Sequence, residues 1–154
     1  MRALENRIPP PALMVIIAAV MAISSRVLEA SPVPLMARLM VSLPLFLAAG
    51  LFGFPAIAAF RQAGTSINPV QISRASTLVT SGIFGITRNP MYVALALLLS
   101  TLAVGLGHLA MVVGPLAFVA FTSRFQIVPE ERTLLRRFGT EYESYRSSVH
   151  RWLW

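Results

Sequence analysis

The stretch PMYVALALLLSTLAVGLGHLAMVVGPLAFVAFTSR, residues 90–124, decides the fold of this chain. Its 33 residues between the terminal proline and arginine carry no formal charge. As one α-helix they would be about 50 Å long, too long for a hydrocarbon core of about 30 Å. The sequence GLGH at 105–108 offers a turn near the middle. We therefore expect a tight hairpin of two short membrane helices, at about 90–105 and 108–124.

The composition of the whole chain agrees with an integral membrane protein. Of its 154 residues, 56% are hydrophobic and only 12% are charged, whereas a soluble domain usually carries about 25% charged residues. All 13 basic residues are arginines that flank the apolar runs, so we interpret them as setting membrane orientation and not as binding nucleic acid. The absence of cysteine excludes disulfides and cysteine-based metal sites, and the two histidines show no metal-ligand pattern.

Two further apolar runs precede the hairpin, at about 12–29 and 35–60. The second is long enough for a tilted or kinked helix. We expect the first to be retained as a membrane span, although AISSRVLEA at 22–30 weakly resembles a signal cleavage site. The polar stretch 61–89 is expected to form an ordered loop, because a loop of this length in so small a protein is more often functional or disordered than idle.

The chain becomes polar and amphipathic after the hairpin. In PEERTLLRRFG, residues 129–139, a proline stands at a suitable first helical position, two glutamates follow in the first turn, and a glycine ends the segment. Apolar and aromatic residues then repeat at helical spacing, at Phe138, Tyr142, Tyr145 and Val149. We expect C-terminal helices over about 129–150.

The placement of the arginines predicts the orientation. Two precede the first span, three lie in the loop 61–89, six follow from Arg124 onward, and the hairpin turn has none. Arg26 and Arg38 do not fit this count. The positive-inside rule then places both termini and the loop in the cytoplasm. The expected fold class is an all-α integral membrane protein, one domain over residues 1–154 with about four transmembrane helices, in a bacterial inner membrane.

Polar residues stand at both ends of the hairpin. Arg88 and Asn89 precede the third span, and Glu130 and Glu131 follow the fourth. Because these ends are neighbours in an antiparallel hairpin, a cation, an amide and two carboxylates are expected to meet at the water–lipid boundary. Such a site suits a ligand with both charges, opposite an apolar ligand from the bilayer. Structural explanations stay open: a membrane anchor for Arg88, a helix start for Asn89–Pro90, and the helix dipole for the glutamates.

Two segments resemble a family of membrane methyltransferases. LVTSGIFGITRNPMYVA, residues 78–94, is similar to the G-P-Y-x-x-x-R-H-P-x-Y stretch of the family that includes isoprenylcysteine carboxyl methyltransferase and bacterial phospholipid methyltransferases. PEERTLLRRFGTEYESYRSSVHRWLW, residues 129–154, resembles the family's closing pattern E-E-x-x-L-x-x-x-F-G-x-x-Y-x-x-Y-x-x-x-V-x-R-(W). The resemblance covers roughly residues 60–154.

The resemblance implies S-adenosylmethionine as cofactor, bound by the last two spans, the loop and the C-terminal segment. The cofactor-binding residues it implies are Gly82, Arg88, Asn89, Pro90, Tyr92, Glu130, Glu131, Leu134 and Tyr142, with Tyr145 and Arg151 as catalytic residues and no metal. Asn89 stands where the family usually has histidine, and Ile83-Phe84 replaces Pro-Tyr. An amide donates and accepts hydrogen bonds but does not titrate near neutral pH.

The expected function is S-adenosylmethionine-dependent methyl transfer to a lipid-like or prenylated acceptor at the cytoplasmic membrane face. A carboxylate or thiolate acceptor is favoured, because an amine must lose a proton and no base is obvious apart from a glutamate or water. The alternatives are a non-catalytic lipid-binding or assembly protein that retains the fold, a small-thiol S-methyltransferase, and a nicotinamide-dependent membrane reductase, for which the chain looks too short. The expected partners are the lipid bilayer and a lipophilic small molecule; the sequence leaves the oligomeric state open.

Overall fold

The computed structural model describes residues 7–28, 31, 33–63 and 77–153, and this part of the chain contains helices and no strand. The α-helices are α1 (Pro10–Ser25), α2 (Leu35–Gln62), α3 (Pro90–Leu106), α4 (Val113–Thr122), α5 (Val128–Phe138) and α6 (Thr140–Ser148). Two short 3₁₀ helices, η3 (Gly82–Gly85) and η4 (Leu109–Val112), and one π-helical segment, η5 (Ser123–Ile127), complete the described elements.

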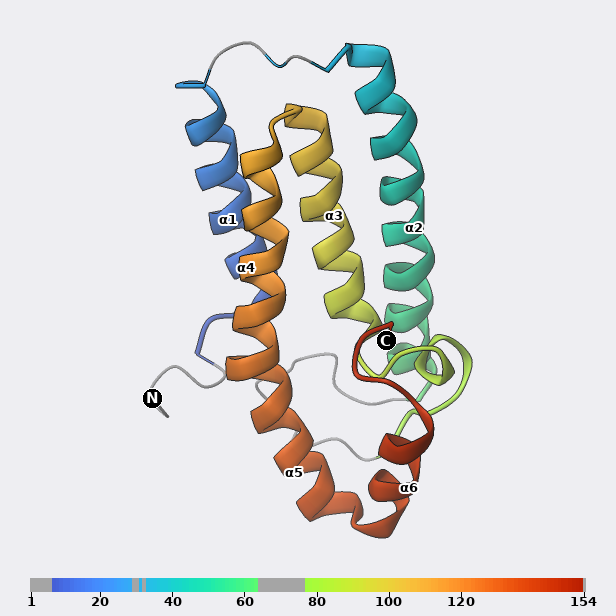
Figure 1. Cartoon of the computed structure of the whole chain (residues 1–154). Coiled ribbons are helices and arrows are strands. Elements are labelled where there is room, and N and C mark those ends of the chain that lie inside the picture. The colour runs from blue at the N-terminus through green and yellow to red at the C-terminus, as the bar shows by residue number, and fades with distance from the viewer. Residues whose placement is uncertain (1–6, 29–30, 32, 64–76, 154) are drawn as a thin grey trace.

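Helix α3 is the centre of the bundle. It contacts α1, α2 and α4, and Figure 1 shows it between α2 on one side and α1 with α4 on the other. Its sequence is apolar on all faces, as expected of a helix with neighbours all round, and Leu99 and Ala103 are buried. Helices α5 and α6 extend below the bundle, on the side where α3 begins. The charged residues of α5 and α6 therefore lie at one end of the molecule, whereas Arg38 lies near the hairpin turn at the other end.

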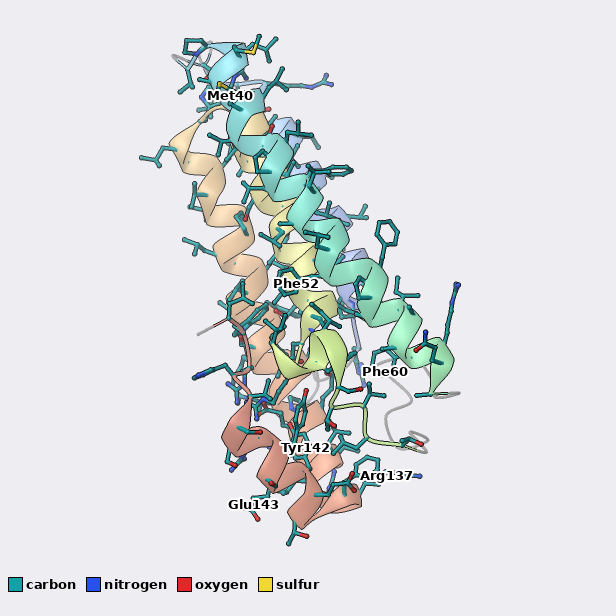
Figure 2. The ribbon with its side chains drawn as sticks, turned by 90° about the vertical axis from the view of Figure 1, so that its right-hand side faces the viewer. Met40, Phe52, Phe60, Arg137, Tyr142 and Glu143 are labelled. Carbon is teal, nitrogen blue, oxygen red and sulfur yellow. The ribbon has the colours of Figure 1, made fainter. Side chains whose placement is uncertain are left out.

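Helix α2 exposes a long apolar surface. Leu51 is 70% exposed and Phe54 76% exposed, and Figure 2 shows side chains standing off α2 along its length, from Met40 to Phe60. Two helices, Leu35–Gln62 and the continuous Leu109–Phe138, are long and apolar enough to cross a membrane. Pro10–Ser25 and Pro90–Leu106 are shorter apolar helices. Together with the exposed apolar surface, these helices indicate a membrane protein; the count of four spans stays a prediction.

The predicted turn of the hairpin lies at the expected place. Helix α3 ends at Leu106, and Gly107 takes a left-handed conformation with φ +76°. A side chain is strained in that conformation, which explains the glycine. The turn is tied to the α1–α2 side of the bundle, because Ser31 Oγ donates to the Gly107 carbonyl at 2.8 Å and Arg38 Nη1 donates to the Gly105 carbonyl at 2.8 Å.

Gly107→Ala is expected to destabilise the protein by about 2 kcal/mol, because it adds left-handed strain to crowding in a packed site. A Cβ at this position would overlap the side chains of Ser31 and Arg38. Thermal unfolding in detergent measures the effect. Gly105→Ala is the matched control: it lies in α3, and a Cβ there meets nothing within 4 Å. Equal melting temperatures for the two variants would contradict this account of the turn.

The expected break between a fourth span and a separate C-terminal helix is wrong. One helix runs from Leu109 to Phe138, and Ile127 and Val128 both have α-helical dihedral angles. Proline lacks an N–H and normally breaks a helix interior. Here the π-helical η5 ends at Ile127, two residues before Pro129, and its wider turn accommodates the proline ring without ending the helix. Glu130 and Glu131 therefore do not lie at a free helix end, and the helix-dipole explanation for them loses its basis.

Other boundaries differ by smaller amounts. Helix α1 begins and ends earlier than the predicted 12–29, and the loop 61–89 lies partly outside the described residues. The C-terminal helices end at Ser148 and not at residue 150, because Val149 is extended, with φ −125° and ψ 133°. We call residues 149–153 the C-terminal strap. In Figure 1 it turns back from α6 and runs up to the start of α3.

Candidate functional site

A cavity of about 280 Å³ lies where α3 begins, between the end of α2, the segment 77–89, α5 and α6. It is lined by Pro10, Pro11, Phe60, Thr77, Leu78, Val79, Phe84, Arg88, Asn89, Pro90, Met91, Tyr92, Leu95, Ile127, Glu130, Glu131, Leu134, Tyr142 and Tyr145. The size approaches the range usual for small-molecule sites. Segments far apart in the sequence therefore build one cavity at the end of the bundle where α5 and α6 lie.

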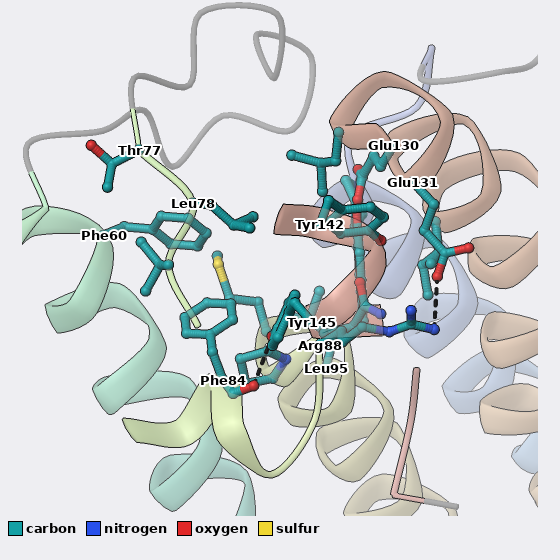
Figure 3. Close-up of a pocket in the computed structure, with 18 of the residues that line it drawn as sticks. Phe60, Thr77, Leu78, Phe84, Arg88, Leu95, Glu130, Glu131, Tyr142 and Tyr145 are labelled. Atoms are coloured by element: carbon teal, nitrogen blue, oxygen red, sulfur yellow. Dashed lines mark hydrogen bonds and ion pairs between the residues drawn. The ribbon is translucent and has the colours of Figure 1, made fainter. Parts of the chain in front are cut away.

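The cavity has an apolar side and a charged side. Figure 3 shows Phe60, Leu78 and Phe84 on one side, and Arg88 with Glu131 on the other. The rings of Phe60 and Phe84 pack edge to face with centroids 5.1 Å apart. A ligand in this cavity would meet hydrocarbon at one end and ionised groups at the other.

Glu131 is the centre of a three-residue charge cluster with Arg88 and Arg151. Arg88 Nη2 lies 3.1 Å from Glu131 Oε1. Arg151 donates from Nε to Oε1 at 3.0 Å and from Nη2 to Oε2 at 2.6 Å, the bidentate geometry of a strong guanidinium–carboxylate pair. These bonds raise the pKa of Arg151, which stays cationic. Two cations against one anion leave the charge cluster with a net charge of +1.

Arg88 is held between the cavity and the protein interior. Its side chain is only 10% exposed, and its Nε is buried with no hydrogen-bond partner among the described residues. Nη1 donates to the Arg146 carbonyl at 3.5 Å, a long contact. Because an unpaired buried donor is costly, this guanidinium has unused capacity for an anionic ligand.

Glu130 has a different environment from its neighbour. It is 8% exposed, and the hydroxyl of Tyr92 donates to its Oε1 at 2.6 Å. Its partner is therefore a neutral group, whereas Glu131 has two cations. A buried carboxylate with a neutral partner favours a cationic ligand, because a positive charge would offset the cost of removing the carboxylate from water.

Asn89 and Pro90 begin α3 as expected, but the amide does not cap the helix. Pro90 is the first helical residue and Asn89 the residue before it, yet no side chain caps this helix start. Asn89 Nδ2 donates instead to the Arg151 carbonyl at 2.9 Å. The same carbonyl accepts from Thr87 Oγ1 at 3.0 Å, and the backbone N–H of Arg88 donates to the His150 carbonyl at 2.9 Å. The segment 87–89 therefore binds the C-terminal strap.

Tyr142 and Tyr145 form the wall contributed by α6. Their ring centroids lie 6.2 Å apart, and the Tyr145 hydroxyl donates to the Phe84 carbonyl at 2.7 Å. Burial raises the pKa of Tyr145, and burial followed by the charge of Glu131 raises that of Tyr142, so both phenols stay protonated at neutral pH. Since the Tyr145 hydroxyl is already bonded to the backbone, this residue contributes its ring to the cavity.

Tyr145→Phe is expected to lower the stability by about 1–2 kcal/mol, because the variant leaves the Phe84 carbonyl without its donor. Thermal unfolding in detergent measures this change. The ring remains, so binding of a ligand that contacts only the ring is expected to be retained. A melting temperature equal to that of the parent protein would contradict a role for this bond in holding η3.

Nine of the eleven residues predicted from the sequence line the cavity: Arg88, Asn89, Pro90, Tyr92, Glu130, Glu131, Leu134, Tyr142 and Tyr145. Arg151 is not among the lining residues and contacts the cavity through Glu131. Gly82 does not line it either; it begins η3 with φ +62°. The roles of all eleven in catalysis and cofactor binding stay predictions.

Sequence reasoning missed the apolar side of the cavity. Phe60, Leu78, Val79 and Met91 come from the end of α2, the loop and the start of α3. No motif marks them. The one available signal was the excess of apolar residues in TLVTSGIFGI, residues 77–86, which is unusual for a solvated loop.

Three comparisons with known proteins bear on this site. A sequence model of a family described as phospholipid methyltransferase matches residues 37–141. An uncharacterized protein of Haemophilus influenzae is 38% identical over 63 residues, which are 41% of this chain and 100% of that protein. No solved structure matches the chain. The range matched by the family includes Arg88, Glu130 and Glu131 and ends before the C-terminal strap.

Proposed function

The chain belongs to the phospholipid methyltransferase family, which indicates methyl transfer to a lipid-like substrate, and from this we propose a specific reaction. The protein transfers the methyl group of S-adenosylmethionine to a lipid-like or prenylated acceptor at the cytoplasmic face of the membrane. One observation carries the proposal: Arg88 from the start of α3 and Glu130 and Glu131 from α5 converge on a cavity whose opposite side is apolar.

The residues present fit this cofactor. S-adenosylmethionine, when bound, supplies an activated methyl group on a sulfonium together with a carboxylate, an ammonium and ribose hydroxyls. Arg88, which lines the cavity, would hold the carboxylate by charge-assisted hydrogen bonds. Glu130 would hold the ammonium, because its own partner is only a neutral hydroxyl. Tyr142 and Tyr145 would wall off the adenine or the methyl group.

The protein's contribution to the reaction is orientation and exclusion of water. Holding two reactants in line is worth roughly 7–11 kcal/mol of barrier at best. The acceptor would enter on the side of Phe60, Leu78 and Met91, where an acyl or prenyl chain finds hydrocarbon. Burial of Glu130 and the apolar wall would limit the access of bulk water to the reacting atoms.

A carboxylate or thiolate acceptor is favoured because both glutamates already have hydrogen-bond partners. Glu131 already accepts from two guanidiniums, and Glu130 accepts from Tyr92. An ionised carboxylate or thiolate needs no base, whereas an amine has to give up a proton.

The placement of the arginines supports the proposed orientation, with both termini cytoplasmic in a bacterial inner membrane.

A labelled-methyl assay tests the proposal. Detergent-purified protein is incubated with S-adenosylmethionine labelled in the methyl group and, in parallel, with a lipid extract, prenylated thiols and carboxylates, an amine lipid, and small thiols. Label in a lipid or prenylated product is the expected result. Label only in small thiols would favour the S-methyltransferase alternative. Binding of NADPH without binding of S-adenosylhomocysteine would overturn the proposal in favour of a reductase.

One observation favours a second candidate, a lipid-binding or assembly protein without catalysis. The amide of Asn89 cannot titrate, and it is used to hold the C-terminal strap. If a proton has to be moved at this position, the chain would bind its ligands without turnover. Binding of S-adenosylhomocysteine together with no labelled product from any acceptor would favour this candidate.

A further inference from the structure

The C-terminal strap is fastened to the start of α3 through its main-chain carbonyls. Three donors come from consecutive residues: Thr87 Oγ1, the backbone N–H of Arg88, and Asn89 Nδ2. The acceptors are the carbonyls of His150 and Arg151. Thr87 is fully buried, and the bonds of Thr87 and Asn89 to the strap are partly buried. The strap is therefore attached to the segment directly before α3, and this segment also contributes to the lining of the cavity.

Arg151 couples this attachment to the charge cluster. Its carbonyl accepts from both Thr87 and Asn89, while its side chain makes the bidentate pair with Glu131. The next residue, Trp152, is 7% exposed and donates from Nε1 to Ser123 Oγ in η5 at 3.0 Å. The strap therefore connects the start of α3 with the π-helical segment of the facing helix, and it carries one of the two cations of the charge cluster.

We propose that Asn89 is a positioning residue: its amide donor keeps the C-terminal strap closed, so that Arg151 stays paired with Glu131, and it acts on ligand binding through Arg151. Only a donor suits this position, because its partner is a carbonyl oxygen. An aspartate of the same shape would set one acceptor against another. The closure of the strap stands on the geometry alone; its coupling to ligand binding rests on the proposed function.

The fluorescence of Trp152 reports whether the strap is closed, and this measurement needs no ligand. The chain has two tryptophans, so Trp154→Phe leaves Trp152 as the single tryptophan. In this background Asn89→Asp is expected to lower the closed-to-open ratio of the strap about tenfold, since a lost buried hydrogen bond has a cost of that order. Acrylamide quenching of Trp152 rises accordingly and its emission shifts to the red. Asn89→His, which keeps a ring N–H donor, is expected to restore the shielding.

Two further variants separate positioning from misfolding. Asn89→Ala removes the donor without adding a charge and is expected to expose Trp152 less than Asn89→Asp does. Ser147→Ala is the matched control, because Ser147 is exposed at the end of α6 just before the strap. Circular dichroism checks that helicity is unchanged. Equal quenching in the parent and in both Asn89→Asp and Asn89→Ala would overturn the proposal.

A double-mutant cycle tests the coupling to the ligand. Titration with S-adenosylhomocysteine is expected to show about tenfold weaker binding for Asn89→Asp and for Arg151→Ala, and no further loss in the double variant. Additive losses would mean that Asn89 contacts the ligand itself, which overturns the positioning role. If the parent protein does not bind S-adenosylhomocysteine, the proposed function fails while the fluorescence result still decides the role of Asn89 in the strap.

Discussion

Arg88→Ala is expected to weaken binding of S-adenosylhomocysteine about 100-fold, because a hydrogen bond between charged groups is worth roughly 1.5–3 kcal/mol and Arg88 offers more than one. Its guanidinium pairs with Glu131 and has an unpaired, buried Nε. Helical content is expected to remain, since Arg88 precedes α3 and its backbone bond to His150 does not depend on the side chain. Isothermal titration calorimetry of the detergent-purified variant measures the loss.

Two other variants make this result interpretable. Glu131→Gln removes the anion between the two guanidiniums while keeping the side-chain shape, and it is also expected to weaken binding without unfolding the protein. Arg136→Ala is the control, because Arg136 is an exposed arginine on α5, the helix that carries Glu131. Unchanged affinity in both Arg88→Ala and Glu131→Gln would remove the assignment of the cofactor site to the charge cluster.

The proximity of Arg88 and Glu131 could be predicted because it follows from a length argument. A run of uncharged residues too long for one membrane helix has to fold back, and its two flanks then meet. The turn at Gly107 needed only a glycine with the freedom to take a positive φ. Features that depend on chain length and local conformation in this way are visible in a single sequence.

The continuity of α4 with α5 could not be predicted from local rules. Pro129 with two following glutamates has the usual appearance of a helix start. The helix continues because η5 changes the backbone register just before the proline. The η5 segment is held in place by residues that are distant in the sequence. Gln126 donates to the Ile8 carbonyl at 2.8 Å, and Ser123 accepts from Trp152. Contacts between residues 118 and 29 positions apart leave no periodic signal in the sequence.

The C-terminal strap shows a second limit. Its acceptors toward α3 are main-chain carbonyls, which every residue type possesses. The side chain of Asn89 had a favourable local use as a helix cap, and the structure uses it for a contact 62 residues away. Propensity identifies the position as a helix start. It cannot decide between a local backbone N–H, from which the side-chain oxygen would accept, and a distant carbonyl that tertiary structure brings to the side-chain N–H.

Glu130→Gln is expected to change stability and ligand binding in opposite directions. A carboxylate buried against a neutral hydroxyl is costly to desolvate, and glutamine keeps the shape and the acceptor for Tyr92. The variant is therefore expected to melt several degrees higher, as a gain of about 1–2 kcal/mol would produce in a protein of this size. Its affinity for S-adenosylhomocysteine is expected to fall by about tenfold or more, because the charge proposed to hold the ammonium is gone.

Tyr92→Phe separates the two contributions of this pair. It leaves the Glu130 carboxylate in place but removes its hydrogen-bond donor, and a loss of about 1–3 kcal/mol of stability is expected. Thermal unfolding with and without S-adenosylhomocysteine then compares both variants. The ligand should raise the melting temperature of Tyr92→Phe more than that of Glu130→Gln, because only the former retains a carboxyl group that can pair with the ammonium. If Glu130→Gln instead melts lower and binds as tightly as the parent, Glu130 serves the packing of α5 against α3, and the ammonium of the cofactor has to be held elsewhere.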